Sequence, residues 1–173
     1  ENAIRMVRLH TNRHKILSFY RSYHGNTTAA IASTGDPRRW PNEYAYGHVH
    51  FFGPYLYRSA FWAKSEEEEC KRALEHLEQV IIFEGAQTIA AILIESVVGT
   101  AGVLVPPVGY LEGVRALCDK YGIKWIADEV MSGFGRTGKW FAYQHSAAEP
   151  DLIVFAKGVN SGYVPLGGVI ISD

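Results

Sequence analysis

Short apolar runs, rich in β-branched residues, recur along the chain, and helical stretches lie between several of them. Strands that are apolar on both faces are typical of a parallel sheet that helices cover on each side. The runs are KILSF at 15–19, TIAAILI at 88–94, IKWIA at 123–127, LIVFA at 152–156 and GGVII at 167–171. The sequence therefore predicts an α/β fold with a mostly parallel sheet and helices on both of its faces.

Helical patterns flank these runs. Apolar residues recur at helical spacing over 65–81, with Ser65 as the N-cap and the acidic run 66–69 in the first turn, where we expect it to be solvated. A second helix stops at Gly122. Residues 35–54 are rich in Pro, Gly and Asn and predict a long irregular loop.

Ionisable residues follow three of the predicted strands directly. Glu95, Asp128 with Glu129, and Lys157 each come where an apolar run ends. In open α/β sheets the ligand crevice lies outside the carboxyl ends of the strands, so these side chains are expected to converge. The apolar approach to Lys157 favours a buried, neutral amine, which is the nucleophile that carbonyl chemistry needs. A structural ion pair at the sheet edge is the alternative interpretation.

A cofactor that contains a pyridine ring and an aldehyde would use these groups. A lysine would hold the aldehyde as a Schiff base, and a carboxylate would keep the ring nitrogen protonated. Asp128 and Lys157 are 29 positions apart, which is enough for a loop, a short helix and a returning strand. Pyridoxal 5'-phosphate fits this description.

Several passages resemble the class III pyridoxal-phosphate aminotransferases, whose fold is known as type I, in the order and spacing of that family. The most specific is a D-E-x-x-x-G-F-G-R-T-G stretch followed by P-D and A-K-G. The resemblance covers essentially the whole chain. The passages are YHGNT at 23–27, IESVVGTAGVLVPPVGYL at 94–111, IADEVMSGFGRTGKWFA at 126–142, PDLIVFAKG at 150–158 and GYVPLGG at 162–168.

The resemblance implies a role for five residues. Lys157 is implied to be the catalytic Schiff-base lysine, and Asp128 to pair with the pyridine nitrogen. Tyr23 is implied to stack on the ring, Val130 to pack on its opposite face, and Glu95 to support the site beside Asp128. The implied reaction moves an amino group from an amine or ω-amino acid to a 2-oxo acid such as pyruvate, most like the branch that acts on β-alanine or taurine. An aminomutase is the nearest alternative, and a cofactor-free aldolase would use the lysine alone.

The stretch GFGRTGKW at 133–140 also matches two nucleotide-binding patterns. A P-loop, however, needs Ser or Thr after its Gly-Lys pair, and here Trp140 follows Lys139. The dinucleotide pattern lacks an acidic residue about 20 positions further on. We therefore keep nucleotide binding by the Gly133–Lys139 loop only as an alternative.

His48 and His50 alternate as metal ligands can, but no third ligand stands at a suitable spacing, and no metal is expected.

Composition narrows the classes of partner. The formal net charge is -1, from 17 basic and 18 acidic residues, and gives no reason to expect nucleic acid or an anionic membrane surface. The apolar runs are far shorter than a bilayer span, and only two cysteines occur, so a cytoplasmic protein with small-molecule substrates is expected.

The resemblance also implies features outside residues 1–173. The chain is expected to be part of a single large domain that binds pyridoxal phosphate, without the phosphate-binding loop and the small C-terminal domain of the family. A homodimer or a dimer of dimers, with the active site at the interface, is implied. Alone, the chain is expected to bind the cofactor poorly and to be inactive, which titration with pyridoxal phosphate would test. Met131 departs from family members with glutamine, and a thioether cannot donate to the cofactor's phenolic oxygen.

Overall fold

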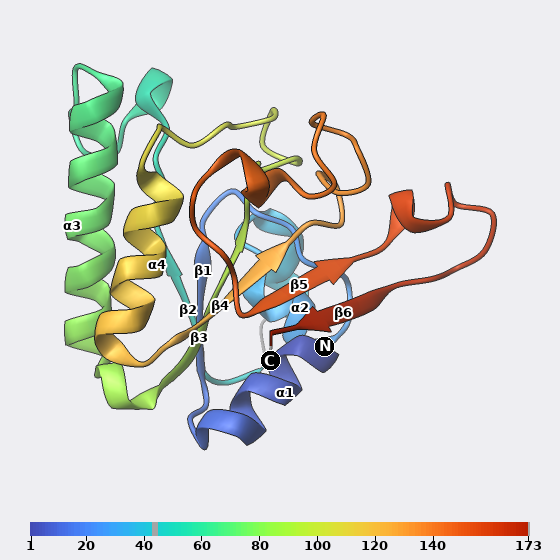
Figure 1. Ribbon diagram of the computed structural model, residues 1–173. Coiled ribbons are helices and arrows are strands. Elements are labelled where there is room, and N and C mark those ends of the chain that lie inside the picture. The colour runs from blue at the N-terminus through green and yellow to red at the C-terminus, as the bar shows by residue number, and fades with distance from the viewer. Residues whose placement is uncertain (43–44, 173) are drawn as a thin grey trace.

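A single sheet forms the centre of the molecule. The computed structural model describes residues 1–42 and 45–172, and in these residues six strands pair in the order β2-β1-β3-β4-β5-β6 (Figure 1). The first five strands of the chain are parallel, whereas β6 runs antiparallel to β5. The strands are β1 (Lys15–Phe19), β2 (His48–Phe51), β3 (Ile89–Glu95), β4 (Lys124–Asp128), β5 (Leu152–Phe155) and β6 (Gly168–Ile171).

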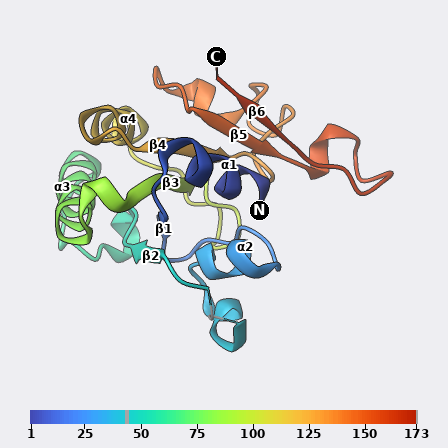
Figure 2. The ribbon, with the colours of Figure 1, turned by 90° about the horizontal axis from the view of Figure 1, so that it is seen from below.

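Helices cover both faces of this sheet. The helices α1 (Asn2–Thr11) and α2 (Thr28–Ser33) pack on one face, and α3 (Glu66–Glu84) and α4 (Tyr110–Tyr121) on the other (Figure 2). The expected α/β class with a mostly parallel, doubly covered sheet is confirmed. Short 3-10 helices occupy Pro37–Asn42, Leu56–Arg58, Ala86–Thr88, Ala142–His145 and Lys157–Val159.

The central strand β3 explains why the apolar runs lack polar alternation. All seven of its residues are buried. Ile92 and Ile94 belong to the core beneath α3 and α4, while Ala91 and Leu93 belong to the core beneath α1. Successive strand residues point to opposite faces, so a strand between two helical layers is apolar along its length, and β3 departs from this only at Glu95, its carboxyl end.

Two local predictions are wrong. The stretch 35–54 is not one irregular loop, because β2 lies within it as the edge strand beside β1. Residues 43 and 44 of this stretch lie outside the described part of the chain. Glu69 in the acidic run is not solvated: it is buried, and its carboxylate accepts from the N–H of Tyr55 at 2.7 Å and the hydroxyl of Ser59 at 2.5 Å. Between β5 and β6 the chain forms only the 3-10 helix Lys157–Val159, and β6 pairs with β5 in the antiparallel direction.

Across the described residues, no helix combines the length and apolar character that crossing a membrane requires. The helix over 66–84 begins as expected, since Ser65 Oγ accepts from the N–H of Glu68 at 3.2 Å. Both cysteines lie on helices, Cys70 on α3 and Cys118 on α4.

His48 on β2 gives a prediction for stability against pH. Its Nδ1 lies 2.8 Å from Ser33 Oγ, and its Nε2 accepts from Arg8 at 3.3 Å. Burial, and then the charges of Arg8 and His50, lower the pKa of His48 from 6.5 to about 4. The folded state therefore disfavours a proton that the unfolded chain takes up below pH 6.5.

We expect the free energy of unfolding to fall as pH drops from about 6.5 to about 4, because the unfolded state binds more protons in that window. Urea unfolding at several pH values measures this slope. The variant His48→Gln should show a shallower slope than the parent protein. Equal slopes in the two proteins would show that His48 does not contribute to the pH dependence of the free energy of unfolding.

Candidate active site

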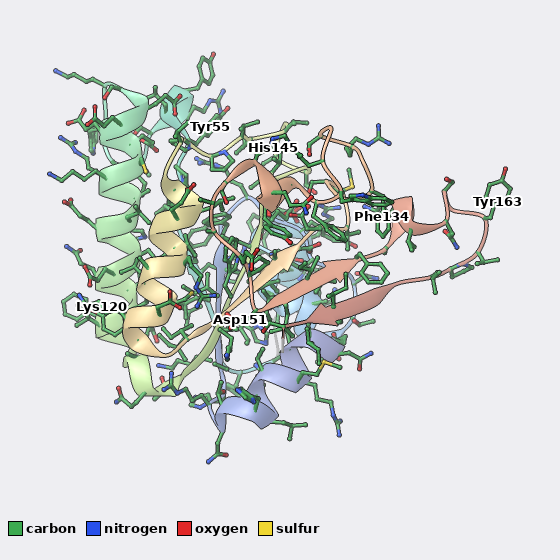
Figure 3. All side chains as sticks on the ribbon, in the orientation of Figure 1. Tyr55, Lys120, Phe134, His145, Asp151 and Tyr163 are labelled. Carbon is green, nitrogen blue, oxygen red and sulfur yellow. The ribbon has the colours of Figure 1, made fainter. Side chains whose placement is uncertain are left out.

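The carboxyl ends of the parallel strands bring the predicted ionisable residues to one edge of the sheet. Glu95 ends β3 and Asp128 ends β4, and the two are partners in the strand register. Lys157 begins the turn that follows β5, three positions beyond Val154, the register partner of Asp128. In Figure 3, Tyr55 and His145 lie at this end of the molecule, and Asp151 lies at the opposite end of the strands. The predicted convergence on one edge is confirmed.

Asp128 is paired with a histidine. Its Oδ2 lies 2.8 Å from Nδ1 of His24, and the two side chains are only 8% and 2% exposed. Its other oxygen, Oδ1, accepts from the N–H of Val130 at 3.1 Å. Because the carboxylate accepts, Nδ1 of His24 carries the proton of this hydrogen bond. In the described part of the chain, the buried Nε2 of His24 has no hydrogen-bond partner.

Glu95 ties together two loops beside Asp128. Its Oε1 accepts from the N–H of Tyr23 at 3.1 Å, and its Oε2 accepts from the N–H of Gly99 at 2.8 Å. Burial raises the pKa of Glu95, while the charge of His24 and the two backbone donors oppose this effect. The carboxylate thus fixes the segment that carries Tyr23 against the turn at 97–103.

Glu129, although adjacent to Asp128 in sequence, has a different environment. It is fully buried and accepts four hydrogen bonds. These fix the end of β4 to the turn after β3 and to the start of the 3-10 helix at Ala142–His145, so its role is structural. The donors are Ser96 Oγ and Ser132 Oγ, both at 2.6 Å, and the N–H groups of Ala142 and Tyr143, both at 2.9 Å.

Lys157 lines an open hollow of about 730 Å³. Its Nζ lies 2.7 Å from Sδ of Met131, and its backbone is in the left-handed region with φ of 43°. Val130 and residues 133–137 line the same hollow. The expectation of a buried amine is wrong, because Lys157 stands beyond the sheet edge on a turn and is exposed.

The five predicted residues therefore lie in two groups. Lys157 and Val130 share the hollow, whereas Tyr23, Glu95 and Asp128, which the structure also describes, are not part of its lining. Val130 connects the groups, since its N–H binds Asp128.

The ring of Tyr23 is already in contact with a cation. The guanidinium carbon of Arg38 lies 3.8 Å from the ring centroid, and Arg38 is paired with Asp36. Tyr23 is half-buried. The face opposite Arg38 is the one at which a second planar group could stack.

The GFGRTG loop folds back on itself and does not open an α-helix. The N–H of Phe134 donates to the carbonyl of Trp140 at 2.6 Å, and that of Gly135 to Lys139 at 3.2 Å. Gly135 and Gly138 have φ of 85° and 89°, which glycine adopts readily. A phosphate-binding loop needs the N-terminus of a helix, so this geometry disfavours the nucleotide alternative.

Comparison with known proteins identifies the family of this chain. The family model described as aminotransferase class-III matches residues 1–173. The chain belongs to the class-III aminotransferases. Among class-III relatives, it is 39% identical over 160 residues to a taurine–pyruvate aminotransferase of Bilophila wadsworthia, covering 91% of this chain and 35% of that protein. It is 39% identical over 186 residues to a diaminobutyrate–2-oxoglutarate transaminase of Halomonas elongata, covering 100% and 39%.

Solved structures of aminotransferases share this fold. The taurine:2-oxoglutarate aminotransferase from Bifidobacterium kashiwanohense, in complex with PLP and glutamate, matches with a TM-score of 0.95 and 52% identity, over 99% of this chain and 40% of that chain. An (S)-enantioselective omega-transaminase from Thermomicrobium roseum matches with a TM-score of 0.94 and 44% identity, over 100% and 40%. This class-III chain thus spans between about a third and two fifths of the length of these proteins.

The sequence pattern of this class-III chain leaves the role of His24 open and does not indicate a role for Arg38. His24 was open to a cofactor contact, a substrate contact or a structural role, and its bond to Asp128 arises from segments 104 positions apart. No sequence pattern marks Arg38, because its contact with Tyr23 depends on how the loop after α2 folds back. Among the described residues, no cluster of three or more His, Cys, Asp or Glu could hold a metal ion; His48 bonds Ser33 instead.

Proposed function

We propose that the protein is an aminotransferase dependent on pyridoxal phosphate, which moves an amino group from an amine or ω-amino acid to a 2-oxo acid such as pyruvate. Its class-III membership supports this proposal. The observation that carries it is that Asp128 and Lys157 leave neighbouring parallel strands at one sheet edge, the acid buried and the amine in a wide hollow. Residues 1–173 then form part of a single large cofactor-binding domain.

The residues present fit this cofactor. A hollow of about 730 Å³ lies in the range of cofactor sites, and its lining includes an amine able to bind an aldehyde. The hydrogen bond from His24 holds the Asp128 carboxylate in a fixed, buried position. When bound, pyridoxal phosphate supplies an aldehyde and an electron-withdrawing ring.

Each of the five residues then has a task. Lys157 would bind the aldehyde and, when free, would move a proton from the amino-bearing carbon of the donor. Asp128 would hold the proton on the ring nitrogen, and His24 would keep the carboxylate in place by its 2.8 Å bond. Tyr23 and Val130 would contact the two ring faces, while Glu95 holds the Tyr23 segment.

The variant Asp128→Asn should lower kcat by about a hundredfold or more, since an amide cannot hold the ring proton by charge. Stopped-flow absorbance of each half-reaction measures this. The control is Asp119→Asn, whose carboxylate pairs with Arg115 on the surface of α4. Near-parental turnover of Asp128→Asn would refute the assignment.

A panel of amine donors, each tested with pyruvate and with 2-oxoglutarate on the intact enzyme, tests the function. Transfer from β-alanine or taurine with a matching keto product would support it. Movement of the amino group within one substrate would instead identify an aminomutase, and activity without bound yellow cofactor would identify an aldolase.

We also propose that the protein is cytoplasmic and forms a homodimer or a dimer of dimers. Cell fractionation tests the location, and analytical ultracentrifugation tests the oligomeric state.

A further inference from the structure

Two arginines and a threonine line a second hollow, beside Tyr23. It measures about 350 Å³, and its lining consists of Arg21, Asp36, Pro37, Arg38, Thr100 and Ala101. We propose that this hollow binds an acid group, a carboxylate or a sulfonate, that the substrate carries beyond its reacting carbon. The proposal rests on the proposed aminotransferase function and names the class of substrate that its site selects.

The charge of the hollow favours an anion. Arg38 is paired with Asp36, which leaves the positive charge of Arg21 in excess. Among the residues that the structure describes, no carboxylate pairs with Arg21: its guanidinium carbon lies 5.2 Å from the ring centroid of Tyr55, and the side chain is half-buried. A half-buried arginine on an aromatic face keeps its hydrogen-bond donors available for a planar acid group.

The backbone holds Arg21 in this position. Its φ is 63°, in the left-handed region that arginine rarely adopts, and its N–H donates to the carbonyl of Gly35 at 3.3 Å. A Cβ at Gly35 would lie 1.9 Å from the carbonyl oxygen of Phe19, so the loop that carries Arg38 is pressed against the segment that carries Arg21. The two cations therefore belong to one constrained unit.

The hollow is linked to the reactive amine. Thr100, in its lining, follows Gly99, and a Cβ at Gly99 would lie 3.1 Å from the side chain of Met131. Met131 in turn contacts Nζ of Lys157. The turn at 97–103 thus contributes to both hollows, and Arg38 stacks on Tyr23. An acid group in the second hollow would lie next to the site in which the amino group reacts.

The test compares two donors on the intact holoenzyme, β-alanine and propylamine, which share a primary amine but differ in the acid. The variants are Arg21→Gln and Arg38→Gln, with Arg58→Gln, an exposed cation of the neighbouring 3-10 helix, as the matched control. We expect kcat/KM for β-alanine to fall about ten- to hundredfold in Arg21→Gln, the range of one charged hydrogen bond. For propylamine it should change less than about threefold.

Equal losses for both donors would overturn the proposal, because they would mean that the arginines only support Tyr23. Unchanged kinetics for both donors would also overturn it. Arg21→Lys, which keeps the charge, should recover part of the selectivity and guards against a folding defect in Arg21→Gln.

Two further measurements show whether the anion in the hollow belongs to the substrate or to the cofactor. They also distinguish a failure of this proposal from a failure of the proposed aminotransferase function. The first is the affinity of the apoenzyme for pyridoxal phosphate and for pyridoxal, and the ratio of the two should be the same in Arg21→Gln as in the parent enzyme. A loss of affinity for pyridoxal phosphate alone would show that the arginines bind the phosphate of the cofactor, and would overturn the proposal. Calorimetric binding of ethanesulfonate should weaken at least about tenfold in this variant. If the parent enzyme transfers no amino group, the proposed function fails, but the ethanesulfonate result still decides whether the hollow binds acid groups.

Discussion

Lys157→Ala should reduce transamination by at least about 10⁴-fold, the largest change expected of any single substitution in this chain. Under the proposed function, the variant would lose both the amine that binds the aldehyde and the base that moves the proton, and proton transfer by a positioned side chain alone contributes up to about 10⁴-fold. Met131 Sδ, 2.7 Å from Nζ, cannot replace it, because a thioether is a weak acceptor and carries no proton. Steady-state rates with the best amine donor measure the loss.

Chemical labelling provides an independent check on the same residue. Borohydride treatment of the yellow holoenzyme should attach the cofactor to the peptide that contains Lys157. The control is Lys139→Ala, which removes an exposed lysine from the neighbouring loop and should leave both rate and labelling intact. A label on any other lysine would refute the assignment.

Glu129→Ala should lower the free energy of unfolding by at least about 4 kcal/mol. The substitution leaves two hydroxyls and two backbone N–H groups without an acceptor in a fully buried place, and each orphaned group costs about 1–3 kcal/mol. Urea unfolding followed by circular dichroism measures the change. Glu129→Gln should lose less, because one oxygen remains.

The matched control is Glu67→Ala, an exposed glutamate in the first turn of α3, for which a change within about 0.5 kcal/mol is expected. A loss below about 1 kcal/mol in Glu129→Ala would show that water or backbone movement satisfies the four donors. The role of Glu129 as an anchor would then be wrong.

The strands that the sequence predicted are those with an unbroken apolar run, whether buried on both faces like β3 or at the exposed edge like β6. An unbroken apolar run such as β3 has few alternatives to a central strand, and its last residue, Glu95, follows directly from that placement. The edge strand β2 escaped prediction because it has only four residues, two of them histidines, within a stretch of turn-forming residues. Edge strands need less apolar surface, so their periodicity is weaker.

The candidate site was predictable only where the sheet itself positions a residue. Asp128 and Lys157 follow strands, and topology brings them to the same edge. The contacts of His24 with Asp128 and of Arg38 with Tyr23 join different loops, and nothing in the local pattern encodes them. Likewise, Glu69 belongs by pattern to a solvated helix start, but the chain at 55–59 folds over it and supplies two donors.

Glu95 and Asp128 are register partners at the carboxyl ends of the adjacent strands β3 and β4. Neighbouring strands lie about 4.8 Å apart whatever their side chains are, so the backbone fixes how far apart the starting points of these two side chains lie. Loops that surround them, including the turn at 97–103, can lengthen or change composition without altering that spacing. Under the proposed function, substrate range and the alignment of the carboxylates would then depend on different parts of the chain.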